Sequence, residues 1–328
     1  MSQTDISRRE FLGASSLLAT GLALFSGSSF GMPAYIPHLG KPNSRFRGVQ
    51  IGVISYSWRS MPSSAEQILQ YCVDSNISAI ELMGPAAEEF AGAPEAPARV
   101  PRGQTATPEQ KREQVEYLAK LAQWRSAVPM KRFEQLGKIY KKAGVDIYAY
   151  KPSALGEKNS DAEVDYAFRA AKALGANQAN VEKPNLSSET KRLGTIAARN
   201  KIYVGYHGHL QQTADWWDEA LSQSDYNAMN FDMGHYVAAG FDPIALLENK
   251  HQHIVSMHTK DRKNKANGGA NMPWGEGDTP VVEVLQMMRD NKYKFPATIE
   301  LEYEVPAGSD AVKETAKCVE FARKALES

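Results

Sequence analysis

The sequence predicts a single α/β domain, a (β/α)8 TIM barrel over residues 48–328, and three observations support this prediction. Eight short apolar runs alternate with helical patterns from Val49 onward, which indicates parallel strands joined by right-handed crossovers. Eight such units suit the ~250 residues typical of this barrel. No Gly-x-Gly-x-x-Gly follows the first apolar run, which argues against an open dinucleotide-binding sheet.

The eight strands are expected at the apolar runs, in chain order. These runs are Val49–Tyr56, Ile77–Leu82, Val145–Tyr150, Asn177–Glu182, Ile202–His207, Ala228–Met233, Ile254–His258 and Ala297–Glu302. The intervening helices carry local signals. Ser63 with Glu66, and Ser160 with Glu163, have the spacing of a capping box at a helix start. Gly144 stands where a helix can end in a left-handed residue before the third strand.

Residues 85–107 interrupt this rhythm with a stretch rich in Ala, Pro and Gly. Thr107, Pro108 and Gln110 then have the pattern of a helix start. Because the stretch follows the second strand, it is expected at the catalytic end of the barrel, as a lid-like insertion or interface element. A disordered insertion is the alternative.

The charge balance restricts the kind of partner. The 328 residues hold 38 Lys and Arg against 38 Asp and Glu, whereas a nucleic-acid binder needs a basic excess. The two cysteines, Cys72 and Cys318, fall on amphipathic helices and are expected to be buried thiols. A disulfide between them is the alternative, because the first and last helices of a closed barrel are neighbours.

Residues 1–30 are expected to be a signal peptide, followed by a linker over residues 31–47. The segment Ser7-Arg8-Arg9-Glu10-Phe11-Leu12 resembles the twin-arginine export signal. The uncharged stretch after it ends near Phe25, and such a stretch is shorter than the ~20 residues of a membrane span. We therefore expect a protein that is periplasmic or otherwise exported by the twin-arginine pathway, with no stable membrane partner after cleavage. An ordinary secretory signal or an uncleaved anchor is the alternative.

Polar residues recur at the ends of the last five strands, namely Glu182, His207, Asp232, His258 and Glu300, and the first four are spaced by 25, 25 and 26 residues. Each spacing is one strand–helix unit, so the side chains should meet at one end of the barrel. Buried charged groups persist only when they are paired or bind a metal. Nitrogen and oxygen ligands without thiolate suit Mn²⁺, Mg²⁺, Co²⁺ or Zn²⁺.

Five motifs around these positions occur in order along residues 49–326. They are Tyr206-His207-Gly208-His209, Phe231-Asp232-Met233-Gly234-His235, His258-Thr259-Lys260-Asp261, Gly275-Glu276-Gly277-Asp278 and Ile299-Glu300-Leu301-Glu302. The last four resemble the sugar phosphate isomerase/epimerase superfamily of xylose isomerase-like TIM barrels. The first motif is similar to the His-x-His of its inosose dehydratase branch.

The resemblance implies four metal ligands: Glu182, Asp232, His258 and Glu300. Glu182 and Glu300 would also be catalytic, exchanging protons with the substrate from opposite sides. A structural ion pair at the barrel mouth is the alternative for these groups. Glu302 shares strand parity with Glu300, so both side chains could face inward.

Further side chains near the strand ends are candidates for binding substrate. They are Trp58, Glu81, Lys151, His207, His209, His235, Lys260 and Trp274. His207 and His235 could instead be direct metal ligands, and the tryptophans could simply pack in the core. His251 and His253 precede the seventh strand and are expected at the surface.

The function that follows is a divalent-metal-dependent sugar isomerase or epimerase acting by proton transfer next to a metal-bound carbonyl. A lyase or dehydratase acting on a keto-sugar, an inosose or a 3-keto-glycoside is the alternative, favoured by Lys151, Lys183 and the His-x-His motif. A non-catalytic sugar- or metal-binding barrel is a third possibility. Apurinic endonucleases share this fold but take histidines from early strands, where this chain has Glu81 and Tyr150. The expected partner is a small carbohydrate, and a homo-oligomer is possible.

Overall fold

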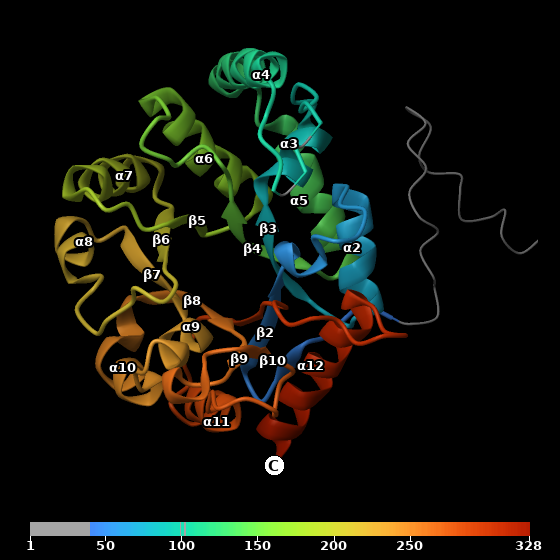
Figure 1. Ribbon diagram of the computed structural model, residues 1–328, viewed down its shortest axis with the longest axis vertical. Coiled ribbons are helices and arrows are strands. Elements are labelled where there is room, and N and C mark those ends of the chain that lie inside the picture. The colour runs from blue at the N-terminus through green and yellow to red at the C-terminus, as the bar shows by residue number, and fades with distance from the viewer. Residues whose placement is uncertain (1–39, 99, 102) are drawn as a thin grey trace, which may run out of the picture. The chain divides into compact units, whose positions relative to one another are not determined.

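The computed structural model describes residues 40–98, 100–101 and 103–328, and within them eight parallel strands close into a barrel surrounded by helices (Figure 1). The barrel strands are β2 (Val49–Ile54), β3 (Ala79–Met83), β4 (Asp146–Lys151), β5 (Gln178–Glu182), β6 (Tyr203–His207), β7 (Asn227–Asp232), β8 (Ile254–Thr259) and β11 (Ala297–Ile299). Their order is β2-β11-β8-β7-β6-β5-β4-β3, and pairing of β2 with β3 closes the ring. The predicted TIM barrel is confirmed. The predicted signal peptide and most of the predicted linker lie outside the described residues.

The helices that follow the strands cover the outside of the barrel (Figure 1). They are α2 (Ala65–Asp74), α3 (Gly84–Ala91), α4 (Pro108–Ala127), α5 (Lys131–Ala143), α6 (Asp161–Leu174), α7 (Ser187–Asn200), α8 (Asp218–Gln223), α9 (Met233–Ala238), α10 (Pro243–Lys250), α11 (Val281–Asp290) and α12 (Ala311–Glu327). Short elements complete the fold: β1 (Arg45–Phe46), η1 (Ser55–Trp58), η2 (His251–His253), β9 (Asp261–Arg262), η3 (Lys265–Asn267) and β10 (Asn271–Met272). Strand β1 runs antiparallel to β2, and β9 pairs with β10 as a small hairpin.

Local signals in the sequence set most of the helix ends. Ser160 and Glu163 form the predicted capping box of α6, and Gly144 ends α5 with φ 91°. The prediction for α2 was wrong by one residue, because its capping box joins Ser64 to Gln67 rather than Ser63 to Glu66. Both pairs have the required spacing and chemistry, so the local sequence cannot choose between them.

The segment over residues 85–107 is only partly irregular. Helix α3 occupies residues 84–91, and α4 then begins at Pro108 with the predicted cap from Thr107. Of the 20 residues of α4, only Leu121 and Arg125 are buried. Nε of Arg125 lies 2.8 Å from Oε1 of Glu88 in α3, and its Nη1 lies 3.4 Å from Oε1 of Glu163 in α6. This buried ion network holds α4 to the barrel wall, while the lid-like role of the segment stays a prediction.

The barrel register brings the strand ends to the same height. Glu182 of β5 pairs with His207 of β6, and Asp232 of β7 pairs with His258 of β8. The inside of the barrel is polar as well as apolar. For example, Nε2 of Gln178 donates to Oγ of Ser256 at 2.6 Å, and both residues are fully buried. Polar side chains of strands that are not adjacent in the sheet, here β5 and β8, therefore meet inside the barrel, where the candidate site lies.

Two further predictions can be compared with the structure. Cys72 in α2 and Cys318 in α12 are both free and buried, as expected for thiols that pack in the core. Burial raises the pKa of each thiol above its ordinary value, so neither is poised as a nucleophile. In the part of the chain that the structure describes, no helix has both the length and the apolar character to cross a membrane.

Candidate metal centre

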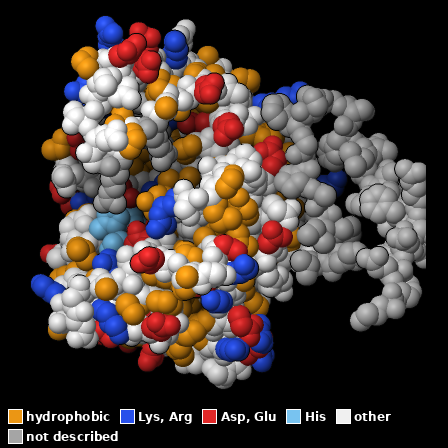
Figure 2. Space-filling view, turned by 45° about the vertical axis from the view of Figure 1, so that its right-hand side comes forward, with side chains coloured by type: hydrophobic (Ala, Val, Ile, Leu, Met, Phe, Trp, Pro, Cys, Tyr) orange, Lys and Arg blue, Asp and Glu red, His pale blue; other side chains and the backbone are white. Residues whose placement is uncertain are grey.

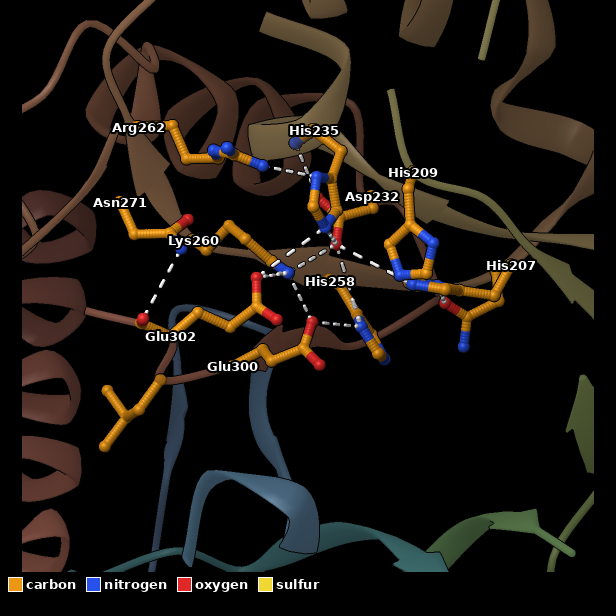
Figure 3. A network of polar contacts seen from close by, with 12 residues as sticks. His207, His209, Asp232, His235, His258, Lys260, Arg262, Asn271, Glu300 and Glu302 are labelled. Carbon is orange, nitrogen blue, oxygen red and sulfur yellow. Dashed lines mark hydrogen bonds and ion pairs between the residues drawn. The ribbon is translucent and has the colours of Figure 1, made fainter. Parts of the chain in front are cut away.

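Four side chains from neighbouring strands converge at one end of the barrel (Figure 3). His207 ends β6, Asp232 ends β7, His258 lies in β8, and Glu300 follows β11. All four are buried, and one potential ligand atom from each lies within 4.8 Å of the others. The sequence predicted Asp232, His258 and Glu300 as ligands, and the structure groups His207 with them instead of Glu182.

The distances within this cluster suit a divalent cation. Oδ2 of Asp232 lies 4.0 Å from Nε2 of His207 and 3.9 Å from Nδ1 of His258, whose Nδ1 lies 2.9 Å from Oε2 of Glu300. Bonds of ~2.0–2.2 Å from a cation to nitrogen or oxygen separate the ligand atoms by about 3 to 4.4 Å. Oδ2 of Asp232 is buried and lies 3.0 Å from Nζ of Lys260, but it makes no hydrogen bond of regular geometry with the described residues. Because a buried carboxylate oxygen without a regular hydrogen bond is costly, the cluster fits a bound cation.

The ring of His258 is held between two carboxylates. Its Nδ1 lies 2.9 Å from Glu300, and its Nε2 lies 2.9 Å from Oε2 of Glu81. Burial alone would lower the pKa of His258, but the charges and hydrogen bonds of Glu300 and Glu81 raise it to about 10. Glu81, predicted to bind substrate, is fully buried in β3. It supplies the carboxylate that commonly orients a metal-binding histidine from its other nitrogen.

Lys260 adds a fixed positive charge next to the cluster. Its Nζ lies 3.0 Å from Oδ2 of Asp232, 2.6 Å from Oε2 of Glu300 and 2.7 Å from Oε2 of Glu302. Burial alone would lower the pKa of this ammonium group, but the surrounding carboxylates raise it above its ordinary value. Lys260 thus partly neutralises the carboxylates, and Asp232 and Glu300 would share their charge between it and a bound metal.

Two further histidines flank Asp232 as neutral rings. Burial lowers the pKa of His207 well below its ordinary value, and the charges of Lys151 and His258 lower it further. Burial, followed by the charges of Lys260 and Arg262, lowers the pKa of His235 to about 2. Both rings therefore remain uncharged at neutral pH, as ligands and neutral hydrogen-bond donors must.

Glu182 lies at the solvent side of the site. Its side chain is 51% exposed, with Oε1 3.0 Å from Nζ of Lys151 and Oε2 3.6 Å from Nδ1 of His209. Glu182 can form a second group of possible ligands with His207 and His209. Figure 2 shows histidine side chains reaching the surface as a small patch beside acidic and basic groups. An exposed carboxylate, an ammonium group and an imidazole thus meet where a substrate can reach them.

The two predicted tryptophans are buried and pack against other aromatic rings. Trp58 is 1% exposed and packs edge-on against Tyr71, which leaves no free face for a sugar ring. Trp274 packs edge-on against Phe321. Of the two histidines expected at the surface, His253 is exposed and His251 is half-buried, stacked on Tyr293.

Two residues that contact the site were not predicted from the sequence. Asn230 lies in β7 and contacts His207, while Arg262 lies in β9 and contacts His235 (Figure 3 labels Arg262). Asn230 precedes Asp232 by two positions, so strand alternation puts both side chains on the same face and could have revealed it. Arg262 carried no such signal, because its contact depends on the path of the β9–β10 hairpin.

Comparison with known proteins places this geometry in a family. A family model described as xylose isomerase-like TIM barrel matches residues 113–324. An inosose dehydratase of Clostridium botulinum is 28% identical over 151 residues, and one of Clostridium tetani is 25% identical over 161 residues. These matches cover 40% and 43% of this chain and 51% and 53% of the relatives. The chain thus spans about half the length of the curated relatives it matches.

Solved structures agree on the fold. The probable 3-DHS dehydratase AsbF of Bacillus anthracis superposes with a TM-score of 0.58 at 17% identity, covering 83% of this chain and 98% of its own. The IOLI protein with a bound zinc atom superposes with a TM-score of 0.56 at 14% identity, covering 84% of this chain and 98% of its own. The chain belongs to the family of xylose isomerase-like TIM barrels.

Proposed function

We propose that the protein is a divalent-metal-dependent enzyme that removes a proton next to the carbonyl of a sugar-derived ketone and then expels an oxygen at the neighbouring carbon. The observation that carries this proposal is the pairing of a buried His207, Asp232, His258 and Glu300 cluster with an exposed group of acid–base side chains beside it. His207, Asp232, His258 and Glu300 would hold the cation, which when bound would polarise the carbonyl and the adjacent hydroxyl and so acidify the neighbouring C–H.

Glu182 is the side chain best suited to remove that proton. Its side chain is 51% exposed and can meet a substrate, whereas Glu300 is buried between His258 and Lys260. Glu300 thus serves mainly to hold the cation, and Glu182 serves as the base. The prediction from the sequence was that Glu182 and Glu300 are both catalytic.

The group beside Glu182 favours elimination as the second step. Lys151 and His209 contact its carboxylate and carry nitrogens that can donate a proton to a departing oxygen. Burial would lower the pKa of Lys151, but Glu182 and Glu81 raise it, so this group stays a cation able to hold a substrate oxyanion. The curated relatives named inosose dehydratases also support elimination.

Isomerisation or epimerisation is the second candidate, and it shares the first step. Return of the proton to the opposite face gives an epimer, and its return to the neighbouring carbon gives an isomer. Epimerisation needs a second proton donor across the substrate, and Glu300 is the carboxylate that could serve, whereas Glu182 itself could return the proton in an isomerisation. The fate of the proton therefore separates the two reactions.

The test is incubation of the Mn²⁺-loaded protein with inososes, ketoses and 3-keto-glycosides in D₂O, read by NMR. We expect loss of water or alcohol from one of these substrates, and at least about a 100-fold slower reaction in Glu182→Gln. Glu320→Gln, which alters an exposed carboxylate of α12, is the matched control. Deuterium incorporation without elimination would favour the isomerase or epimerase. Metal binding without either reaction would favour a non-catalytic barrel and contradict the proposal.

We also propose that the protein is exported by the twin-arginine route, on the basis of Arg8 and Arg9. Replacing both with lysine in the bacterial host should retain the precursor in the cytoplasm. Unchanged export of the double variant would contradict this route.

A further inference from the structure

Two histidines approach the same oxygen of Asp232 from different elements. Nε2 of His207 in β6 and Nε2 of His235 in α9 each lie 4.0 Å from Oδ2 of Asp232. In both rings the other nitrogen, Nδ1, is engaged by a side chain on the far side, Asn230 for His207 and Arg262 for His235. These two partners differ in hydrogen-bonding chemistry, and the difference decides which ring nitrogen holds the proton.

Asn230 fixes His207 with the proton on Nδ1. The amide Nδ2 of Asn230 donates to Oε2 of Glu81 at 3.2 Å, and a carboxylate can only accept. The carbonyl Oδ1 of Asn230 must therefore face Nδ1 of His207, which lies 3.0 Å away. A carbonyl oxygen accepts, so Nδ1 of His207 donates. Nε2 of this neutral ring then carries a free lone pair directed toward Asp232.

Arg262 fixes His235 the other way round. A guanidinium group has five N–H donors and no acceptor. Its Nη1 donates to Nδ1 of His235, and its Nε donates to the backbone oxygen of Gly269 at 3.0 Å. Nδ1 of His235 is thus an acceptor without a proton, and the neutral ring carries its proton on Nε2. That Nε2–H lies 3.6 Å from Oε2 of Glu302, is buried, and has no hydrogen-bond partner among the residues described.

We propose that Asn230 and Arg262 hold His207 and His235 as opposite tautomers, so that His207 offers a lone pair to the cation and His235 offers an N–H to a substrate oxygen bound beside it. The donor role of Nδ1 in His207 and its acceptor role in His235 follow from the contacts alone, whereas the cation and the substrate oxygen rest on the proposed function. Asn230 and Arg262 are positioning residues, since each acts through a histidine.

This arrangement gives the two sides of Asp232 different ligands. A cation is bound by the lone pair of His207 but repelled by the N–H of His235. A carbonyl, hydroxyl or alkoxide oxygen of the substrate has the lone pairs that the N–H requires. The centre is therefore built for one cation with a substrate oxygen next to it on the His235 side.

The test is NMR of the metal-free protein labelled with ¹⁵N-histidine, in which long-range ¹H–¹⁵N correlations distinguish a protonated ring nitrogen from an unprotonated one. His207→Gln and His235→Gln identify the two signals. We expect the proton on Nδ1 of His207 and on Nε2 of His235. A proton on Nδ1 of His235, or on Nε2 of His207, would overturn the proposal.

Variants of the two positioning residues sharpen this test. Arg262→Met and Asn230→Leu should each leave their own histidine as a mixture of tautomers and leave the other unchanged. Asn230→Asp should preserve the tautomer of His207, because a carboxylate still accepts from Nδ1–H, and Arg262→Lys should restore part of the His235 tautomer. Signals of His251 and His253 serve as internal controls. Unchanged tautomers in Arg262→Met and Asn230→Leu would overturn the roles of these residues. If either variant fails to fold, Asn230→Asp and Arg262→Lys still test them.

Titration with Zn²⁺, which is diamagnetic, tests whether His207 and not His235 binds the cation. We expect the Nε2 signal of His207 to shift on binding while His235 keeps its Nε2–H. Loss of that proton from His235 would show that it binds the metal and would overturn the proposal. Failure of Zn²⁺ to bind would contradict both the role of His207 as a cation ligand and the proposed function. The tautomers of the metal-free protein would still decide whether Asn230 and Arg262 position the two histidines.

Discussion

The molecule contains two buried clusters of charged side chains that differ in how completely they are satisfied. In the Arg125 network, both carboxylate oxygens of Glu88 accept hydrogen bonds, and Glu163 is bonded through both of its oxygens. In the barrel cluster, Nε2 of His235 has no hydrogen-bond partner among the described residues, and Oδ2 of Asp232 has only the ammonium of Lys260 at 3.0 Å, without a hydrogen bond of regular geometry. A closed network stabilises a fold, whereas unpartnered buried atoms mark a place that is completed by a ligand.

The largest effect on metal affinity is expected from a change at Oδ2 of Asp232. Asp232→Asn removes the negative charge but keeps the shape of the side chain, and we expect it to weaken Mn²⁺ or Zn²⁺ binding by at least about 100-fold. Isothermal titration calorimetry measures this loss. Asp310→Asn, at the exposed cap of α12, is the control. Unchanged affinity in Asp232→Asn would remove Asp232 from the centre.

The Arg125 network should show the opposite pattern, in which a substitution lowers stability but leaves metal affinity unchanged. Arg125→Met leaves the buried carboxylates of Glu88 and Glu163 without their cation. The free energy of unfolding should fall by about 3–5 kcal/mol, while metal affinity stays the same. Urea denaturation followed by circular dichroism measures the first, and calorimetry the second. A variant that loses metal binding but keeps its stability would reverse the roles given to the two clusters.

A smaller effect is expected from the carboxylate behind His258. Glu81→Gln keeps the shape of the side chain but replaces the charge that orients Nε2 of His258. Metal affinity should fall by about 10- to 100-fold, as for other residues that support a ligand through a hydrogen bond. Equal affinity in Glu81→Gln and the wild type would show that His258 needs no such support.

The pH dependence of the metal-free protein gives an effect that is spread over several pH units. The pKa of His258 is raised to about 10 in the folded protein, above the ~6.5 of an unfolded histidine. Its contribution to stability is therefore complete below pH 6.5 and is lost as pH rises toward 10. The free energy of unfolding should fall by up to about 1.4 kcal/mol per pH unit across that window. His258→Gln should flatten this slope in urea titrations, and an equally steep slope in that variant would assign the titration to another group.

Much of the fold and part of the site could be predicted from the sequence. Strand ends carry the chemistry in a barrel, so the spacing from His207 through Asp232 to His258 located three of the four clustered residues. The same spacing also selected Glu182, but its side chain lies beside Lys151 and is half exposed. Strand position gives the height of a residue in the barrel but not the partner that its side chain meets.

Other features depended on contacts between distant segments. Glu81 and His258 are 177 residues apart in the chain, and Asn230 and Glu81 are 149 apart. Strand order in the closed barrel brings them together, and their hydrogen bonds decide the role of Glu81 as a support for His258. No pattern within a single strand contains this information.

The most direct test of the metal centre is anomalous diffraction from crystals of the full chain soaked in Mn²⁺. We expect one strong peak within bonding distance of His207, Asp232, His258 and Glu300. A peak bound only by Glu182 and His209, or a cluster that stays empty at saturating Mn²⁺, would contradict the account.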